Sequence, residues 1–143
     1  MKKADPISTE IIRNAFISIA QDMNAVLIRS AYTPVIYEVK DCVVAFLDEK
    51  GEVLGQSSGL PLFLGNLQVC VQETAKMYGW DYFKEGDIFF VNDSFFTGTQ
   101  LNDITIFAPI FWNGKLAGFS GSRAQWLDVG GKEPGGSRDA TKS

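Results

Sequence analysis

Near the start of the chain, apolar residues recur every three or four positions, which is the repeat of an α-helix. Asp5 and Pro6 suit the start of this helix, because Asp accepts hydrogen bonds from free N–H groups and Pro fits the first turn. The pattern predicts a helix over Ile7–Ala31. Its apolar positions extend beyond one face, since Ile17 and Ile28 lie outside the main stripe. In a two-layer domain the sheet covers one side of such a helix, so we expect a partner subunit, or further sequence, to cover the other.

Short runs of β-branched and aromatic residues predict strands after this helix. Pro34 ends the helix, because the residue before a proline avoids the helical region. Strands are then expected at Val35–Val39, Cys42–Leu47 and Val53–Gln56. A polar turn at residues 48–51 joins the last two of these strands into a hairpin.

A second helix and further strands are expected in the remainder of the chain. Apolar residues at helical spacing predict a helix over Gly65–Tyr78, and Gly79 stops it. Strands follow at Asp87–Val91, Ile104–Trp112 and Lys115–Ser120, with a loop at 92–100. Asn113-Gly114 favours a type I′ hairpin turn between the last two strands, because both residues accept a positive φ.

This order of elements predicts an α+β fold with a largely antiparallel sheet and two helices, not alternating β-α-β units. The length of 143 residues suits one domain. We expect this domain at residues 1–128, followed at 129–143 by a Gly-rich C-terminal arm that cannot build regular structure.

Charge and composition exclude several classes of partner. Thirteen basic and seventeen acidic residues give a net charge of −4 without a long basic run, which excludes nucleic acid as a partner. No apolar run approaches the roughly 20 residues that span a bilayer, and no signal-peptide core is present, so we expect a cytoplasmic protein without membrane contact. Cys42 and Cys70 lie in separate apolar stretches and are expected to be buried thiols.

The chain contains no histidine. Ser-His-Asp triads, Cys-His dyads and HExxH zinc sites all require imidazole, so this chain cannot form any of them alone. Acid–base chemistry therefore falls to carboxylates, lysine, tyrosine or a residue of another chain.

Short motifs run through the whole chain in a characteristic order and spacing. They are Asp5-Pro6-Ile7, Arg29-Ser30-Ala31-Tyr32-Thr33-Pro34, Lys40-Asp41, Leu64-Gly65-Asn66, Gly86-Asp87-Ile88, Asn92-Asp93, Gly98-Thr99, Asp103-Ile104-Thr105, Ser122-Arg123-Ala124 and Asp128-Val129-Gly130-Gly131. Together they resemble the N-terminal portion of the hydantoinase B family, whose members are several times longer. The resemblance implies subunits of ATP-dependent hydantoinases, 5-oxoprolinases, and acetone or acetophenone carboxylases. Such subunits work with a hydantoinase A-like partner that phosphorylates a carbonyl or enolate oxygen.

The resemblance also implies a His/Asp/His metal site, in motifs like Gly-Thr-His-Leu-Pro-Asp and Arg-Ala-His-His. The corresponding positions of this chain are Gln100, Asp103 and Gln125, so only the aspartate is retained. An amide oxygen is a weak neutral ligand, which makes this set poor for Mn or Zn. We expect no cofactor held by this chain, with Asp103 hydrogen-bonded by the amides. A bound transition metal and a site completed by another subunit stay open as alternatives.

The resemblance places five further residues at a possible site wall. Asn92 and Asp93 either contribute to the site or cap the loop after a strand. Arg123 either clamps a carboxylate or phosphate or makes a surface or interface ion pair. Phe95 and Phe96 belong to the core, to an interface, or to an apolar aromatic wall. The catalytic residues stay unknown at this stage.

One hypothesis and two alternatives follow. The first is a small subunit of a multi-subunit ATP-dependent carboxylase, similar to acetophenone carboxylase, that carboxylates a ketone with bicarbonate. The chain would aid assembly and lend residues to a site wall, while larger hydantoinase A-like and hydantoinase B-like subunits handle ATP and Mg or Mn. The alternatives are a fragment of an ATP-dependent hydantoinase or oxoprolinase-type amidohydrolase, and a standalone binding module for an apolar aromatic ligand.

Overall fold

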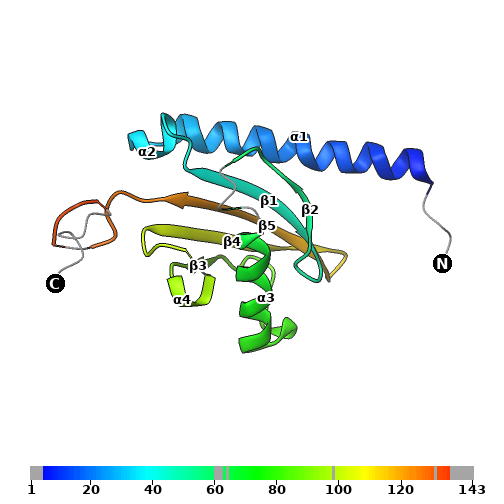
Figure 1. Ribbon diagram of the computed structural model, residues 1–143. Coiled ribbons are helices and arrows are strands. Elements are labelled where there is room, and N and C mark those ends of the chain that lie inside the picture. Colours follow the sequence, from blue (N-terminus) through cyan, green and yellow to red (C-terminus); the bar gives the residue numbers. More distant parts are fainter. Residues whose placement is uncertain (1–4, 60–62, 64, 98, 131, 136–143) are drawn as a thin grey trace.

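A computed structural model of the chain describes residues 5–59, 63, 65–97, 99–130 and 132–135 (Figure 1). Its elements are α1 (Pro6–Ser30), α2 (Pro34–Tyr37), β1 (Cys42–Asp48), β2 (Val53–Gln56), α3 (Asn66–Tyr78), the 3-10 helix η2 (Trp80–Tyr82), β3 (Phe89–Val91), α4 (Ser94–Thr97), β4 (Asp103–Trp112) and β5 (Lys115–Gln125). The strands form one antiparallel five-stranded sheet in the order β2-β1-β5-β4-β3. The expected α+β fold with an antiparallel sheet is confirmed. Helices α1 and α3 lie on opposite sides of the sheet, so the expectation of two layers was wrong.

Helix α1 begins as expected and packs closely on the β1–β2 hairpin. The Asp5 side chain accepts a hydrogen bond from the backbone N–H of Ser8 at 3.1 Å. Gly55 of β2 permits the close approach, because a Cβ there would lie 2.9 Å from Cβ of Phe16. Ala20 is the one fully buried residue of this helix. The exposed large apolar residues on it are Ile7, Ile11, Ile12, Ile19 and Val26. Within the described ranges nothing covers these side chains, which agrees with the broad apolar pattern of the sequence.

Residues Val35–Val39 do not form the expected strand. Pro34–Tyr37 form the short helix α2, with Pro34 in the first turn, where its missing N–H costs no hydrogen bond. Thr33 is extended (φ −105°, ψ 134°), as the residue before a proline prefers. The proline that follows α1 therefore starts a new helix instead of a strand.

The hairpin of β4 and β5 forms around the expected Asn-Gly turn. Asn113 and Gly114 have φ values of 50° and 72°, in the left-handed region that this turn requires. Strand β5 continues past the expected end at Ser120 as far as Gln125, because every residue from Gly118 to Gln125 pairs with β4. This extension brings the second half of β5 to the candidate site.

Strand and helix boundaries elsewhere differ modestly from expectation. Strand β3 begins at Phe89 instead of Asp87. The expected loop at 92–100 contains the short helix α4, and its Gly98 lies outside the described residues. Of the expected Gly-rich arm, positions 129–130 and 132–135 form neither helix nor strand, and the rest falls outside the described ranges.

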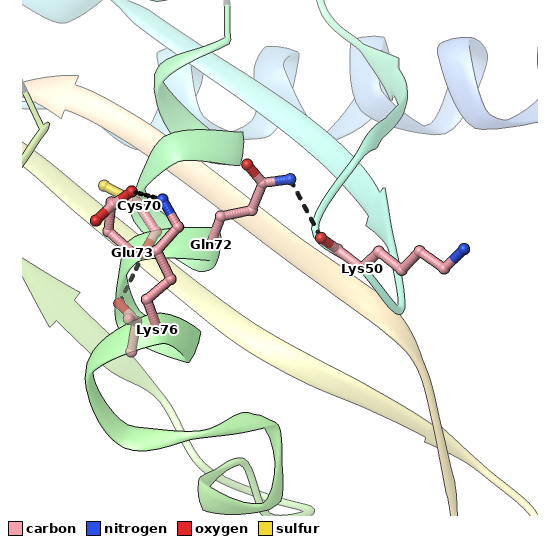
Figure 2. A network of polar contacts seen from close by, with 6 residues as sticks. Lys50, Cys70, Gln72, Glu73 and Lys76 are labelled. Carbon is pink, nitrogen blue, oxygen red and sulfur yellow. Dashed lines mark hydrogen bonds and ion pairs between the residues drawn. The ribbon is translucent and has the colours of Figure 1, made fainter.

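The main core lies between α3 and the sheet. Its buried residues are Leu47, Cys70, Val71, Ala75, Phe83, Phe107 and Phe119. The Phe83 ring contacts those of Phe119 and Phe89 edge-on, at centroid distances of 4.9 and 5.1 Å. Gln72 of α3 donates a hydrogen bond to the Lys50 carbonyl at 3.3 Å, which ties the helix to the β1–β2 turn (Figure 2).

Both cysteines are buried free thiols, as expected. Cys42 lies on the α1 side of the sheet with Ile36 and Ala124, and Cys70 lies in the core on the α3 side. In the described part of the chain no helix is both long and apolar enough to cross a membrane.

Candidate functional site

Strand pairing brings polar side chains together at one end of the sheet. Asp103 at the start of β4 stands opposite Gln125 at the end of β5. The backbone N–H of Gln125 donates to the carbonyl of Asp41, just before β1, at 3.1 Å. Alternate residues of a strand share one face, so Asp41, Gln125 and Asp103 form a row on the α3 side of three neighbouring strands. Arg123 belongs to the next row, between Val43 and Thr105.

Asp103 is held mainly by the backbone. Its side chain is 2% exposed, and its Oδ2 accepts a hydrogen bond from the backbone N–H of Gln100 at 3.1 Å. The Asp103 N–H in turn donates to the Gln100 carbonyl at 3.0 Å. The Gln125 side chain donates from Nε2 to Oε1 of Gln100 at 3.2 Å. The two amides therefore bond to each other, and the expectation that they hydrogen-bond Asp103 was wrong.

Asp41 is a second carboxylate of this row. It was not among the site residues expected from the sequence. Its Oδ1 is buried, and no described residue offers it a hydrogen bond. Burial raises the pKa of Asp41 above its ordinary value, and the negative charge of Asp103 raises it further. Alternation along β1 was the signal that could have found it, because Asp41 shares a face with Val43 of the core.

Arg123 is the most deeply buried charged residue of the site, with 1% of its surface exposed. Its Nη2 donates to Oγ1 of Thr97 at 3.2 Å, and its Cζ lies 5.6 Å from the centre of the Phe63 ring. Burial lowers the pKa of Arg123, while Cys70 and Asp103 act in the opposite direction. The two ion pairs found among the described residues involve other side chains, so the interpretation of Arg123 as a surface ion pair was wrong.

The loop residues Asn92 and Asp93 make local hydrogen bonds. Oδ1 of Asp93 accepts from the backbone N–H groups of Phe95 and Phe96 at 2.9 and 3.2 Å, at the start of α4. Asn92 donates from Nδ2 to the Leu101 carbonyl at 3.5 Å. The contacts of Asp93 fit the capping interpretation, whereas Asn92 bonds a carbonyl nine residues away and caps nothing in the described part of the chain.

The two phenylalanines of this loop have different surroundings. Phe95 is fully exposed, with a relative exposure of 101%, whereas Phe96 lines a hollow of about 300 Å³. This hollow is lined by Thr74, Met77, Tyr78, Tyr82, Phe89, Phe90, Val91, Asp93 and Phe96. Gln100, Asp103 and Gln125 do not line it, so the structure separates the aromatic wall from the carboxylate row.

A reciprocal pair of hydrogen bonds fixes the end of the sheet at the site. Asn102 donates from Nδ2 to the Trp126 carbonyl at 2.8 Å, and the Trp126 N–H donates to the Asn102 carbonyl at 2.8 Å. Asn102 precedes Asp103 and Trp126 follows Gln125, so this clamp sets the positions of both site residues. The sequence does not reveal this clamp, because it depends on the pairing of β4 with β5.

The side chains present do not fit a transition-metal site. Oε1 of Gln100 is engaged by Gln125, and Oδ2 of Asp103 is engaged by a backbone N–H. Over the described residues, no group of three or more His, Cys, Asp or Glu side chains is placed to hold a metal. Carboxylates paired with amides can instead orient a polar group through hydrogen bonds.

Comparison with known proteins supports one family. The Hydantoinase B/oxoprolinase model matches residues 5–143. An uncharacterized protein of Methanocaldococcus jannaschii is 36% identical over 138 residues, which cover 92% of this chain and 24% of that protein. The caprolactamase subunit beta of Pseudomonas jessenii is 27% identical over 136 residues, covering 95% of this chain and 23% of that subunit.

Two solved structures share the fold. The ATP-dependent caprolactamase of Pseudomonas jessenii superposes with a TM-score of 0.78 at 25% identity, covering 93% of this chain and 23% of that chain. Nucleotide-free acetone carboxylase gives a TM-score of 0.81 at 24% identity, over 92% of this chain and 17% of that chain. This chain thus spans about a quarter or less of the length of these relatives. Because the family model matches nearly its whole length, the chain belongs to the hydantoinase B/oxoprolinase family.

Proposed function

We propose that this chain is a small subunit of a multi-subunit, ATP-dependent carboxylase of the acetophenone carboxylase type, which carboxylates a ketone with bicarbonate. In this proposal the chain helps the complex to assemble and forms part of the wall of the substrate site. Larger hydantoinase A-like and hydantoinase B-like subunits bind ATP and Mg or Mn in this proposal. The ATP dependence named for both caprolactamase and acetone carboxylase supports this general kind of reaction.

The state of the carboxylate row carries the proposal. The chain has no imidazole, and the two amides at the family's ligand positions are bonded to each other. Such a row can orient a substrate or a neighbouring loop through hydrogen bonds, and its amides are weak ligands for a transition metal. A contribution to a site that other chains complete is therefore the role that these residues support best.

The outer side of α1 supports assembly with another chain. Ile7, Ile11 and Ile12 are 70%, 64% and 57% exposed on one end of this helix. Monomeric proteins rarely leave such large apolar side chains grouped in water, and similar groups mark protein interfaces. The caprolactamase subunit beta, a relative of this chain, is by its name part of a multi-subunit enzyme, which supports a partner subunit on this surface.

Hydrolysis of a cyclic amide is the alternative for the same complex. Caprolactamase, by its name, acts on a lactam, and it matches this chain about as well as acetone carboxylase does. A second candidate is a binding module for an apolar aromatic ligand, which the aromatic hollow beside Phe96 favours.

Purification of the tagged chain from its native cells tests the proposal directly. We expect hydantoinase A-like and hydantoinase B-like chains to accompany it in mass spectrometry. The complex should consume ATP with bicarbonate and a ketone, but not with hydantoin, 5-oxoproline or caprolactam. Turnover of the cyclic amides instead would support the amidohydrolase alternative. A solitary chain that is active and metal-loaded would refute both.

Substitutions on α1 test the assembly surface. Ile11→Lys places a charge in the proposed interface, whereas Ile88→Lys places one at an apolar residue that is 74% exposed and far along the sequence from α1. We expect Ile11→Lys to lose the accompanying chains while the isolated protein keeps its melting temperature. Retention of the partners by Ile11→Lys, at the level seen with Ile88→Lys, would contradict the role of α1.

A further inference from the structure

Arg123 has more hydrogen-bond donors than the described residues satisfy. Nη2 donates to Thr97, but Nε and Nη1 are buried and have no partner in the part of the chain that the structure describes. A guanidinium carries five N–H groups, and two pairs of them can each bind both oxygens of one anion. These two forks are Nε with Nη2 and Nη1 with Nη2, so Nη2 takes part in both. Thr97 engages one N–H of Nη2, so at least one complete fork stays open.

A third unsatisfied polar atom lies beside this fork. Thr105 stands directly opposite Arg123 in the β4–β5 pairing, and its buried Oγ1 has no well-aligned hydrogen-bond partner among the described residues, although it lies close enough to the Cys70 sulfur to lower the pKa of that thiol. Opposed residues of antiparallel strands have Cβ atoms about 5 Å apart, so their side chains face the same small region. Cys70 borders this region as a neutral thiol, because burial raises its pKa. A thiol is a weak acceptor and does not satisfy a guanidinium.

The desolvation free energy of a buried, unpaired guanidinium indicates that an anion binds here. A buried cation is costly unless a negative group pairs with it and accepts its hydrogen bonds. Asp103 lies close enough to act on Arg123 electrostatically, yet the two form no ion pair. Arg123 Nε, Arg123 Nη1 and Thr105 Oγ1 are therefore three neighbouring donors that an added acceptor would satisfy.

We propose that the open fork of Arg123 and the hydroxyl of Thr105 form a binding site for a small oxyanion with one negative charge and the planar shape of a carboxylate. Two oxygens of such an anion match a guanidinium fork, and a lone pair on one of them accepts the hydroxyl. Phe63, which covers the guanidinium, gives the site an apolar wall. The charge of Asp103 disfavours a dianion, so phosphate should bind more weakly than formate, acetate or bicarbonate.

The isolated chain contains every residue of this anion site, so the site does not require the proposed carboxylase complex. The test is thermal melting of the 143-residue protein in formate, acetate, bicarbonate or phosphate, against chloride at equal ionic strength. A ligand at about 100 times its Kd should raise Tm by about 5 °C or more. Line broadening of ¹³C-formate in NMR reports binding without reference to stability.

Three variants assign the effect to the site. Arg123→Met should abolish both the Tm shift and the line broadening, and Arg123→Lys should weaken them because an ammonium lacks the fork. Arg29→Met is the matched control, since Arg29 is exposed on α1, and it should behave like the wild type. If Arg123→Met does not fold, Thr105→Val retains the guanidinium and should weaken formate binding about tenfold.

The outcomes are decisive in either direction. A carboxylate-specific shift that disappears with Arg123 or weakens with Thr105 supports the site, even if no carboxylase activity is ever found. Equal shifts in chloride and formate, or a formate signal that survives both Arg123→Met and Thr105→Val, would overturn it. Stronger stabilisation by phosphate than by formate would refute the proposal that the bound anion carries a single negative charge.

Discussion

Replacing Phe83 by alanine should greatly reduce the free energy of unfolding of the chain. Phe83 is 3% exposed and follows η2 at the end of α3. Its ring contacts those of Trp80, Phe89, Phe107 and Phe119 at centroid distances from 4.9 to 6.2 Å. The substitution therefore opens a cavity at the point where α3 and the sheet meet.

The expected loss follows from burial and packing. Phe→Ala in a core costs about 3–5 kcal/mol, which combines the lost transfer free energy with the cavity. The free energy of unfolding of a domain is about 5–15 kcal/mol. Phe83→Ala should therefore still fold, but with a much reduced free energy of unfolding. With a urea m-value of about 2 kcal/mol/M, a loss of about 4 kcal/mol lowers the midpoint by about 2 M.

Phe95→Ala is the matched control, because it makes the same chemical change at a residue that is 101% exposed. Its free energy of unfolding should change by less than about 0.5 kcal/mol. Urea unfolding followed by circular dichroism measures both variants under one condition. A loss below about 1 kcal/mol for Phe83→Ala, or equal losses for the two variants, would refute the assignment of Phe83 to the centre of the core.

Three further changes test other parts of the structure. Gly118→Ala should destabilise the chain by about 2 kcal/mol or more in urea unfolding, because its Cβ would lie 2.2 Å from the Leu47 carbonyl; an unchanged midpoint would contradict the β1–β5 register. Asp41→Asn should stabilise the chain at pH 7, because the raised pKa of Asp41 means that its charged form disfavours folding. That gain should shrink as the pH falls through the raised pKa, and a pH-independent difference in urea midpoints would contradict this linkage. The double variant Gln100→His, Gln125→His should bind about one equivalent of zinc by elemental analysis, whereas equal metal in the parent chain would show that the amides do not prevent binding.

Sequence patterns predicted the elements whose signals are local. The α1 helix followed from its apolar repeat and from the cap at Asp5, and the β4–β5 turn followed from Asn113-Gly114. The segment after Pro34 was predicted wrongly, because a proline both ends one helix and suits the first turn of another. Propensity alone does not distinguish these two outcomes.

The candidate site was predicted only in part, because strand register creates it. Asp103, Gln125 and Arg123 were identified from motifs, but their rows depend on the pairing of β4 with β5. Asp41 is far from these residues in sequence, and only the position of β1 beside β5 brings it to the row. Sequence alone also gave no indication that Arg123 would be buried with Nε and Nη1 unpaired, since that depends on the packing of Phe63 and Thr97 around it.

The paired hydrogen bonds between Asn102 and Trp126 have a mechanical consequence. Residues 127–130 and 132–134 are exposed, and the Gly135 N–H donates to the Leu127 carbonyl, so this segment folds back on itself. A force applied to this stretch would reach the backbone next to Asp103 directly, because the two hydrogen bonds join the residues adjacent to Asp103 and Gln125.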